Sequence, residues 1–399
     1  MISKRALALA PSETMKISGM AKEMQQAGKS VVSLSQGEPD FKTPEHICAA
    51  AKKAIDDGQH GYTINAGTTG LREAIAEKLK RENELEFTAA EIIVSNGAKQ
   101  SVGFSLLAVV DEGDEVLIPA PYWVSYPEMT KLAGGVPVVV RTAFENDYKL
   151  TPEQLRESLT PKTKVLILCS PSNPTGSCYT ADELRALAEV LRDFPNVVVL
   201  SDEIYEYIVF DGPHVSMLQV APWLKERFIL VNGFSKGFAM TGWRVGYIAA
   251  PKSIAGAVGK IQSQETSAPS TISQFAAEEA YRSEVSAGAV EHMRKAFAER
   301  RDFFIDELNQ IEGVKCFKPG GAFYAFPNIA AYLGKTSPQG EVIRTSTDLC
   351  MYLIEHQGLA IVPGDAFGEP EGVRLSYSAS METLAEGLKR FRTGLAALK

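Results

Sequence analysis

Short apolar runs alternate with amphipathic stretches along the middle of the chain. The runs are rich in Val, Ile and Leu, a composition typical of strands that are buried on both faces of a sheet. They predict strands at residues 92–94, 115–118, 136–140, 165–169, 197–200 and 228–231. Several of the stretches between them have the apolar spacing of helices that cover a sheet. The alternation predicts an α/β fold with a mainly parallel sheet between two layers of helices.

The expected helices begin at recognisable residues. Two begin with a capping box, because Thr151 and Thr180 each stand three residues before a Gln or a Glu. Another begins at Thr43-Pro44-Glu45, with Thr43 as the cap and Pro44 at the first helical position. Further helices of this part are expected at residues 12–27, 71–83, 100–110 and 126–132.

The pattern changes after residue 283. A long helical stretch over 283–311 is followed by short strands near Phe323, at 359–362 and at 373–377, by a helix over 347–356 and by a closing helix. We expect these elements to pack with the amino-terminal segment as a smaller α+β domain. The predicted division is a large domain of residues 46–294 and a small domain of residues 1–45 and 295–399.

Composition and charge argue against several classes of partner. The chain has 399 residues and a formal net charge of −8, so it offers no basic excess for nucleic acid. No segment has the length and hydrophobicity of a membrane span, and residues 1–10 lack the apolar core of a signal peptide. The five cysteines are scattered, and the five histidines show no metal-ligand spacing. We expect a cytoplasmic protein with no bound metal, no nucleic acid partner and no membrane contact.

One lysine lies where open α/β sheets place their ligands. Lys236 follows the run at 228–231, and Arg244 comes eight residues later. A desolvated lysine is a nucleophile for carbonyl groups, whereas an arginine suits a phosphate. The pair therefore predicts a ligand with an aldehyde and a phosphate, as in pyridoxal phosphate. Ser235 also completes Gly-x-Ser-x-Gly, the nucleophile elbow of serine hydrolases, which is a competing interpretation of this loop.

Three other loops at predicted strand ends carry polar residues. Residues 96–99 open a helix, so their backbone N–H groups suit a phosphate. Residues 170–176 contain two prolines and offer the Asn173 amide as a donor. Asp202 ends a buried run, where a carboxylate needs a cation such as a protonated pyridine nitrogen. Tyr205, three residues on, is placed to donate to an oxygen of the same ring.

A series of motifs occurs in order over nearly the whole chain. They are Gly37-Glu38-Pro39-Asp40, Asn173-Pro174-x-Gly176, Asp202-x-x-Tyr205, Ser235-Lys236 with Arg244, Pro319-Gly320-Gly321-Ala322-Phe323-Tyr324, and Arg374 within Val373-Arg374-Leu375-Ser376-Tyr377. In this combination the chain resembles a class I aminotransferase of pyridoxal-phosphate fold type I. The amino-acid sequences of residues 121–127 and 239–244 are most similar to those of bacterial aspartate aminotransferases. The resemblance implies a seven-stranded sheet, pyridoxal phosphate as cofactor, and transfer of an amino group between an L-amino acid, expected to be aspartate, and 2-oxoglutarate.

The resemblance also implies roles toward the cofactor ring. Lys236 would form the Schiff-base link to the cofactor and move the proton during catalysis. Asp202 would pair with the pyridine nitrogen, and Asn173 and Tyr205 with the ring oxygen. Trp123 would stack on the ring.

Further roles concern the phosphate, the substrate and a second subunit. The residues implied at the phosphate are Arg244, Ser235, Ala98 and Lys99. Arg374 would clamp the substrate α-carboxylate in a bidentate pair, with Gly37, Asn173 and Trp123 beside it. Tyr62 is similar to a family tyrosine that reaches the phosphate of the neighbouring subunit, which implies a homodimer with shared active sites.

Several points stay open at this stage. Gly233 stands where many members of the family have a serine on the phosphate. Lys99 is either the cation that reads a distal carboxylate or a second phosphate partner or solvated charge. Aromatic, prephenate and alanine amino donors are alternatives to aspartate. A serine hydrolase using Ser235 would need a histidine, for which His292 and His356 are the candidates.

Overall fold

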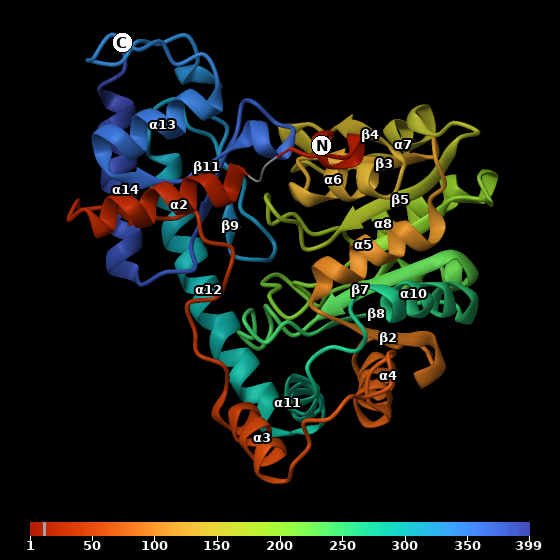
Figure 1. Cartoon of the computed structure of the whole chain (residues 1–399). Helices are drawn as coiled ribbons and strands as arrows, with labels where there is room; N and C mark the ends of the chain where they lie inside the picture. The colour runs from red at the N-terminus through yellow and green to blue at the C-terminus, as the bar shows by residue number, and fades with distance from the viewer. Residues whose placement is uncertain (11–12) are drawn as a thin grey trace.

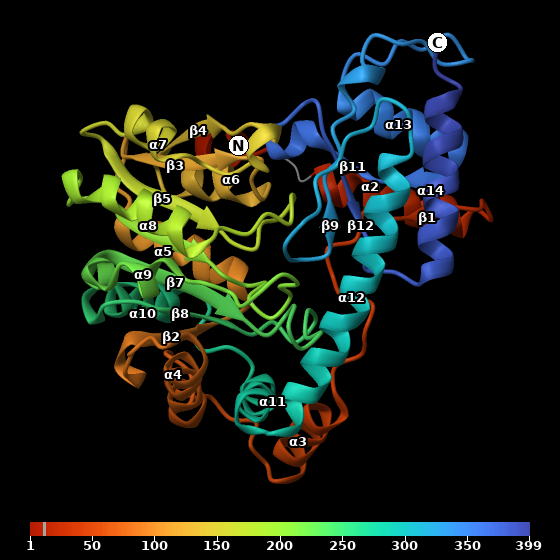
Figure 2. The same ribbon diagram turned by 180° about the vertical axis from the view of Figure 1, so that it is seen from behind.

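The computed structural model describes residues 1–10 and 13–399. The chain forms a larger body from its middle and a smaller body from both of its ends (Figure 1). The long helix α12 (Val285–Asn309) runs from one body to the other, as the view from behind also shows (Figure 2). The two ends of the chain therefore meet in one body.

A seven-stranded sheet forms the centre of the larger body, in the order β2-β8-β7-β6-β5-β3-β4. The strands are β2 (Ile92–Ser95), β3 (Glu115–Ala120), β4 (Val136–Arg141), β5 (Thr163–Cys169), β6 (Val198–Asp202), β7 (Phe228–Gly233) and β8 (Gly246–Ala249). Neighbouring strands are parallel except for β8, which runs antiparallel between β7 and β2. The mainly parallel sheet is confirmed. The pattern did not predict β8, whose four residues pair with β7 on one side and with the distant β2 on the other.

Both faces of this sheet are buried under helices. In β6, Val198 and Leu200 join one core cluster, whereas Val199 joins the other, as the alternation of a strand requires. One face is covered by α5 (Ala98–Val109), α6 (Ser125–Leu132) and α10 (Lys252–Glu265). The other is covered by α3 (Glu45–Asp56), α4 (Thr69–Asn83), α7 (Pro152–Ser158), α8 (Ala181–Val190), α9 (Met217–Val220) and α11 (Thr271–Arg282). The predicted two helix layers are confirmed.

The predicted capping boxes are confirmed. The Thr151 hydroxyl accepts from the Gln154 N–H at the start of α7, and the Gln154 side chain accepts from the Thr151 N–H. Thr180 and Glu183 make the same exchange at the start of α8. These residues satisfy N–H groups that a helix start leaves unpaired.

The predicted cap at Thr43 is wrong. Helix α3 begins at Glu45, with Pro44 as the residue before it and no side-chain cap. The Thr43 hydroxyl donates instead to the Ala239 carbonyl at 2.8 Å and accepts from the Trp243 indole at 3.0 Å. Because the Thr43 hydroxyl bonds to this distant loop, it does not cap the helix.

The smaller body has two small sheets and a core of its own. Strand β1 pairs in parallel with β10, and β11-β12-β9 form an antiparallel sheet. The elements are α2 (Glu13–Gln26), β1 (Val32–Ser33), β9 (Tyr324–Ala325), α13 (Ser346–Gln357), β10 (Leu359–Ala360), β11 (Val362–Pro363), β12 (Val373–Ser376) and α14 (Met381–Ala396). The predicted first residue of α2, Ser12, lies outside the described residues. One hydrophobic cluster takes in members from α2 and from α14, which holds both chain ends together.

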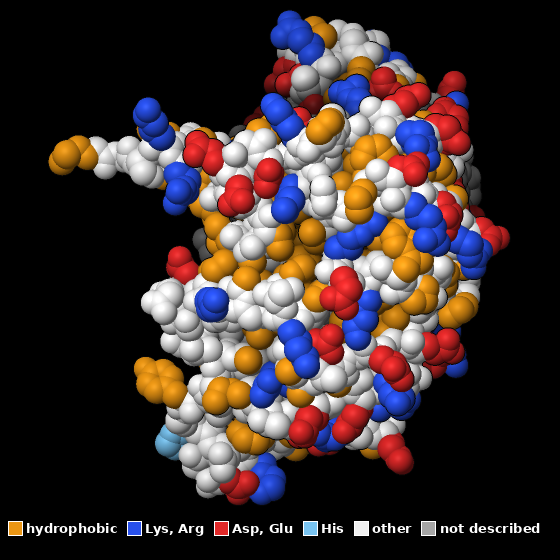
Figure 3. Space-filling view, turned by 90° about the vertical axis from the view of Figure 1, so that its right-hand side faces the viewer, with side chains coloured by type: hydrophobic (Ala, Val, Ile, Leu, Met, Phe, Trp, Pro, Cys, Tyr) orange, Lys and Arg blue, Asp and Glu red, His pale blue; other side chains and the backbone are white. Residues whose placement is uncertain are grey.

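The surface carries charges of both signs. Figure 3 shows acidic and basic side chains interspersed over one face of the molecule. An arm with a hydrophobic tip projects from the body in this view. Residues 1–8, which include the short helix α1 (Lys4–Leu7), are exposed. Among the described helices, none combines the length and the hydrophobicity that crossing a lipid bilayer requires.

Candidate active site

A cavity of about 600 Å3 lies between the two bodies, at the carboxyl ends of the central strands. Parallel strands bring their carboxyl ends to one edge of a sheet, so loops that are far apart in sequence meet there. Every residue that the sequence assigned to the site lines this cavity, apart from Tyr62. These residues are Gly37, Ala98, Lys99, Trp123, Asn173, Asp202, Tyr205, Ser235, Lys236, Arg244 and Arg374.

Lys236 lies in the loop that follows β7. Its Nζ donates to the carbonyl of Gly37 at 2.5 Å, which joins the larger body to the amino-terminal segment. Desolvation lowers the pKa of this lysine to about 8; the charge of Glu38 opposes the shift, and the charges of Arg374 and Arg244 favour it. A measurable fraction of the amine is therefore neutral near pH 7, which makes Lys236 a nucleophile for carbonyl groups.

Asp202 is the last residue of β6 and is 4% exposed. Tyr126 Oη donates to its Oδ2 at 2.7 Å, and the Ile204 N–H donates to Oδ1 at 3.3 Å. Burial raises the pKa of Asp202 to about 6; the bond from Tyr126 opposes this rise, and the charge of Glu203 adds to it. A buried carboxylate with this affinity for a proton suits a cationic partner inside the cavity.

A second carboxylate, on Glu203, is buried next to Asp202 but does not line the cavity. Ser201 and Ser216 donate to its Oε1 at 2.8 and 2.7 Å, and His214 Nε2 lies 2.9 Å from its Oε2. Burial raises the pKa of Glu203, but these partners outweigh burial, and the pKa is lower than usual. The network holds the end of β6, so that Asp202 alone faces the cavity. Apart from the Asp-Glu pair itself, no pattern in the sequence indicated this network.

Tyr205 reaches the cavity wall and meets a tyrosine of the smaller body. Its Oη lies 2.8 Å from Tyr324 Oη, and both side chains are buried. Asn173, in the loop that follows β5, is also buried and lines the same cavity. The sequence assigned roles to Tyr205 and Asn173, but not to Tyr324 or to Tyr126, although both stand in motifs that carried the resemblance.

The cavity has a cationic end at the start of α5. Arg244 has φ +56°, a left-handed conformation that is uncommon for a side chain of this size. Its Nη1 donates to the Thr241 carbonyl at 2.8 Å, and its Nη2 donates to the Asn96 carbonyl at 3.3 Å. Gly97 has φ +84°, and a Cβ there would lie 2.5 Å from Arg244 Nη2, so another residue would be strained and would displace the guanidinium. A guanidinium beside a helix N-terminus suits an anion such as a phosphate.

The close packing of two strands explains a glycine at position 233. Its strand β7 pairs with β8, and Gly233 is opposite Gly246. A Cβ at position 233 would lie 2.9 Å from Gly246 Cα and 3.0 Å from the Val245 carbonyl. A serine there would require the two strands to move apart, whereas Ser235 lies nearby on the cavity wall.

A second cationic centre lies on β12. Arg374 is 3% exposed; its Nη1 donates to Asn173 Oδ1 at 3.0 Å, and its Nη2 donates to the Ser35 carbonyl at 2.7 Å. Its Nε has no hydrogen-bond partner, and the ring centre of Tyr324 lies 4.6 Å from the guanidinium carbon. Within the described residues no carboxylate pairs with this buried cation. It therefore suits a carboxylate that arrives with a ligand.

Lys99 lies beside Trp123, with its Nζ 5.3 Å from the ring centre. Desolvation, helped by the charge of Arg244, lowers the pKa of Lys99. The lysine thus offers a charge at the cavity between the indole and the cationic end, and both predicted roles for it stay open. Three residues of helix α2, none of which the sequence analysis selected, also line the cavity: Ala21, Lys22 and Gln25.

Tyr62 does not line the cavity of its own chain. Its side chain is 100% exposed in the loop between α3 and α4. A role at an active site would therefore have to be at the site of another copy, as the resemblance implies.

The competing serine-hydrolase interpretation lacks a base. Ser235 lines the cavity, but no histidine does within the part of the chain that is described. His292 packs edge-on against Phe41, with ring centres 6.0 Å apart, and His356 packs against Tyr352 at 5.5 Å. Ser235 consequently has no imidazole to accept its proton.

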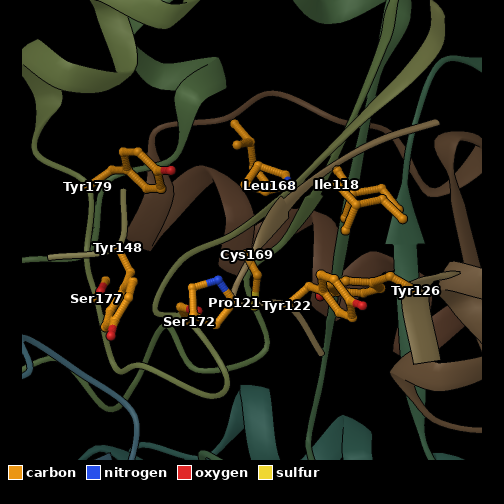
Figure 4. A pocket seen from close by; sticks show the side chains of 12 residues that line it. Ile118, Pro121, Tyr122, Tyr126, Tyr148, Leu168, Cys169, Ser172, Ser177 and Tyr179 are labelled. Atoms are coloured by element: carbon orange, nitrogen blue, oxygen red, sulfur yellow. The ribbon is translucent and has the colours of Figure 1, made fainter. Parts of the chain in front are cut away.

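A second, much smaller cavity lies behind the main one. Tyr126 and Cys169 line both, and Figure 4 shows the smaller one enclosed by aromatic rings and loop residues such as Pro121 (Figure 4). Its volume of about 20 Å3 is enough for a buried water molecule but not for a substrate. The main cavity is therefore the better candidate for chemistry.

Solved structures resemble the whole chain. The aspartate aminotransferase from Rhizobium meliloti has a TM-score of 0.96 at 42% identity and covers 100% of both chains. The aspartate aminotransferase from Thermus thermophilus with maleate has a TM-score of 0.92 at 41% identity, over 98% of this chain and 99% of that one.

Sequence relatives agree with the structures. A protein of Petunia hybrida, described as a bifunctional aspartate aminotransferase and glutamate/aspartate-prephenate aminotransferase, is 48% identical over 100% of this chain and 83% of its own length. The aspartate aminotransferase of Geobacillus stearothermophilus is 46% identical over 98% of this chain and 97% of its own. The family described as aminotransferase class I and II matches residues 29–391. On its sequence, its fold and the arrangement of this cavity, the chain belongs to the class I and II aminotransferases.

Proposed function

We propose that this aminotransferase uses pyridoxal phosphate to move an amino group between L-aspartate and 2-oxoglutarate. One observation carries the proposal: an amine with a lowered pKa, Lys236, lies between two separate anion sites, at Arg244 and at Arg374. One site suits a phosphate and the other a carboxylate, as an amino-acid enzyme with a phosphorylated aldehyde cofactor requires.

The residues around the cavity fit this cofactor. Lys236 would bind its aldehyde carbon, and the buried Asp202 carboxylate would pair with its pyridine nitrogen. The residues that would bind the phosphate are Arg244, Ser235, Ala98 and Lys99, and those beside the ring would be Asn173, Tyr205 and Trp123. When bound, pyridoxal phosphate supplies an electron sink that stabilises negative charge at the substrate α-carbon.

Lys236 has the acid–base properties that proton transfer requires. With a pKa of about 8, its Nζ is able to take the proton from the α-carbon near neutral pH and to give it back. A lysine with its ordinary pKa of 10.5 would be almost entirely charged there and unable to act as a base. Burial thus prepares the residue for its task.

Arg374 would bind the α-carboxylate of the substrate. Its guanidinium is held by Asn173 and by the Ser35 carbonyl, which fixes the direction of the remaining donors. Gly37, whose carbonyl accepts from Lys236, brings the amino-terminal segment to the same place. Lys99 is the candidate for the second carboxylate of aspartate, and its alternative is a phosphate or solvent contact.

Aspartate is favoured among the possible donors by the relatives. Those of Geobacillus stearothermophilus and Bacillus subtilis are described as aspartate aminotransferases, and that of Cereibacter sphaeroides as an aspartate/prephenate aminotransferase. Prephenate is therefore the first alternative to test. An aromatic aminotransferase of Pyrococcus horikoshii is a further structural neighbour, at a TM-score of 0.87.

We also propose a cytoplasmic homodimer with shared active sites. The complete exposure of Tyr62 supports a contact with a second copy, as do the exposed Ile55 and Ile64 near it. Five free cysteines support a reducing compartment.

The proposed domains are residues 46–294 and residues 1–45 with 295–399. The core of the smaller body takes its members on α12 from Met293 onward, which supports a boundary near residue 294. Residue 294 lies inside α12, so the boundary would follow side-chain packing rather than a break in the helix.

The visible spectrum of the purified protein tests the proposal. With pyridoxal phosphate, the wild type should show a visible band that changes when aspartate is added. Cysteine sulfinate and phenylalanine are the comparisons, and the order of response ranks the substrates. Lys236→Ala should keep its circular dichroism spectrum and lose turnover. A wild type that stays colourless with pyridoxal phosphate, or full activity in Lys236→Ala, would refute the proposal.

A further inference from the structure

Two tyrosine hydroxyls meet in the wall of the main cavity. Tyr205 follows β6 in the larger body, and Tyr324 begins β9 in the smaller body. Their Oη atoms lie 2.8 Å apart, and the side chains are 3% and 0% exposed. A Cβ on Gly37 would lie 3.4 Å from Tyr324 Oη, so the amino-terminal segment also encloses this hydroxyl.

The two neutral phenols have two hydroxyl protons between them. Each neutral phenol has one proton to donate. Burial raises the pKa of both groups, so both are neutral near pH 7. The hydrogen bond between them uses one proton and leaves the other free. The direction of this bond decides which hydroxyl is able to donate into the cavity.

The position of Arg374 favours Tyr324 as the donor in this pair. The guanidinium carbon lies 4.6 Å from the centre of the Tyr324 ring. Burial raises the pKa of Tyr324, and the charge of Arg374 is the strongest influence in the opposite direction. The same charge also lowers the pKa of Tyr205, but there it is weaker than the influences of Tyr324 and Cys169, which raise that pKa. A nearby cation makes a phenol more acidic, and the more acidic of two phenols is the better donor. The proton that stays free is then the one on Tyr205.

We propose that Tyr324 is a positioning residue, which donates to Tyr205 Oη and so turns the Tyr205 proton into the cavity. This inference rests on the proposed function, in which Tyr205 donates to the ring oxygen of pyridoxal phosphate. Tyr324 contacts Arg374 with its ring and Tyr205 with its hydroxyl. It therefore links the site for the substrate carboxylate, on the smaller body, to a donor for the cofactor on the larger body.

The test is Tyr324→Phe, which keeps the ring over Arg374 and removes one oxygen. The readout is the pH midpoint of the visible absorbance of the protein loaded with pyridoxal phosphate, without any amino acid. Tyr324→Phe should move the midpoint in the same direction as Tyr205→Phe but by less. Roughly half a pH unit is expected, which is about a threefold change in the proton equilibrium. In a Tyr205→Phe background, Tyr324→Phe should leave the midpoint unchanged.

Tyr281→Phe is the matched control. Tyr281 Oη lies 3.1 Å from Tyr247 Oη, and this buried pair does not line the cavity. Tyr281→Phe removes one hydroxyl from a buried tyrosine pair and should leave the pH midpoint of the visible absorbance unchanged. Thermal unfolding of Tyr324→Phe and Tyr281→Phe measures how much each lost hydroxyl contributes to the stability of the protein.

Three results would overturn the inference. The first is a midpoint in Tyr324→Phe equal to that of the wild type. The second is a shift that persists in the Tyr205→Phe background, because Tyr324 would then act without Tyr205. The third is an unmoved midpoint with a raised KM for the amino acid, which would direct the Tyr324 proton to the substrate. A wild type that shows no visible band with pyridoxal phosphate would instead refute the proposed function.

Discussion

Replacing Asp202 with Asn should stabilise the cofactor-free protein at high pH and weaken cofactor binding. Asp202 is 4% exposed and accepts from Tyr126 and from the Ile204 N–H. Burial raises its pKa from 3.8 to about 6. Above that pH the cofactor-free protein contains a buried anion whose cationic partner is missing. Asn keeps an oxygen for Tyr126 and removes the charge.

The magnitude follows from the difference in pKa. Because the folded protein binds this proton more tightly than the unfolded chain, the free energy of unfolding falls as the pH rises from about 4 to 7. The full loss, when both states are ionised, is about 3 kcal/mol. At pH 5 it is about 1.6 kcal/mol, because only the unfolded carboxyl is mostly ionised. The advantage of Asp202→Asn over the wild type should therefore be about 1.4 kcal/mol larger at pH 8 than at pH 5.

Urea unfolding of both cofactor-free proteins at pH 5 and pH 8 measures this difference, at one protein concentration. The contribution of Lys236 should nearly cancel, because Asp202 is the weakest of the charges that act on it. The affinity for pyridoxal phosphate should fall roughly 10- to 100-fold, since one charge-assisted hydrogen bond is lost. An advantage that is equal at both pH values, or undiminished cofactor affinity, would refute the reasoning.

Two other substitutions test separate parts of the structure. Arg374→Lys should raise the KM for the amino acid about 10- to 100-fold with a smaller change in kcat. The reason is that an ammonium group cannot replace the paired N–H donors of the guanidinium that Asn173 orients. Steady-state kinetics measure this, and an unchanged KM contradicts it. Lys78→Met should lower the free energy of unfolding by about 3–5 kcal/mol, because Lys78 is fully buried and pairs with Glu206, next to Tyr205. Lys78→Met with Glu206→Gln should recover much of this loss in urea unfolding, and an equal loss in both variants would show that the unpaired charge is not its cause.

Most elements of the fold were predictable because they depend on local patterns. The runs that became β5, β6 and β7 are apolar throughout, as strands buried on both faces must be. Helices α10 and α11 are not among the predicted helices, and two further features were not predictable from local patterns. Strand β8 exists because it pairs with β7 and β2. Thr43 fails to cap α3 because a loop some two hundred positions away takes its hydroxyl.

The sequence also located most of the candidate site. Asp202 ends β6 and Lys236 follows β7, two strands that lie next to each other in the sheet, and parallel strands end at one edge. Their partners came from elsewhere in the chain. Tyr126 is 76 positions from Asp202, and Tyr324 is 119 positions from Tyr205, so no spacing rule connects them.

The sequence by itself determined the class of fold, the family, and the residue types that face the cavity, because apolar periodicity and short motifs are properties of neighbouring positions. The tertiary structure decided the protonation of Lys236 and Asp202, which depends on how deeply each group is buried and on the charges around it. It also decided the arrangement of donors around Arg374 and Tyr324. Distances between residues from opposite ends of the chain exist only after the two bodies have packed together.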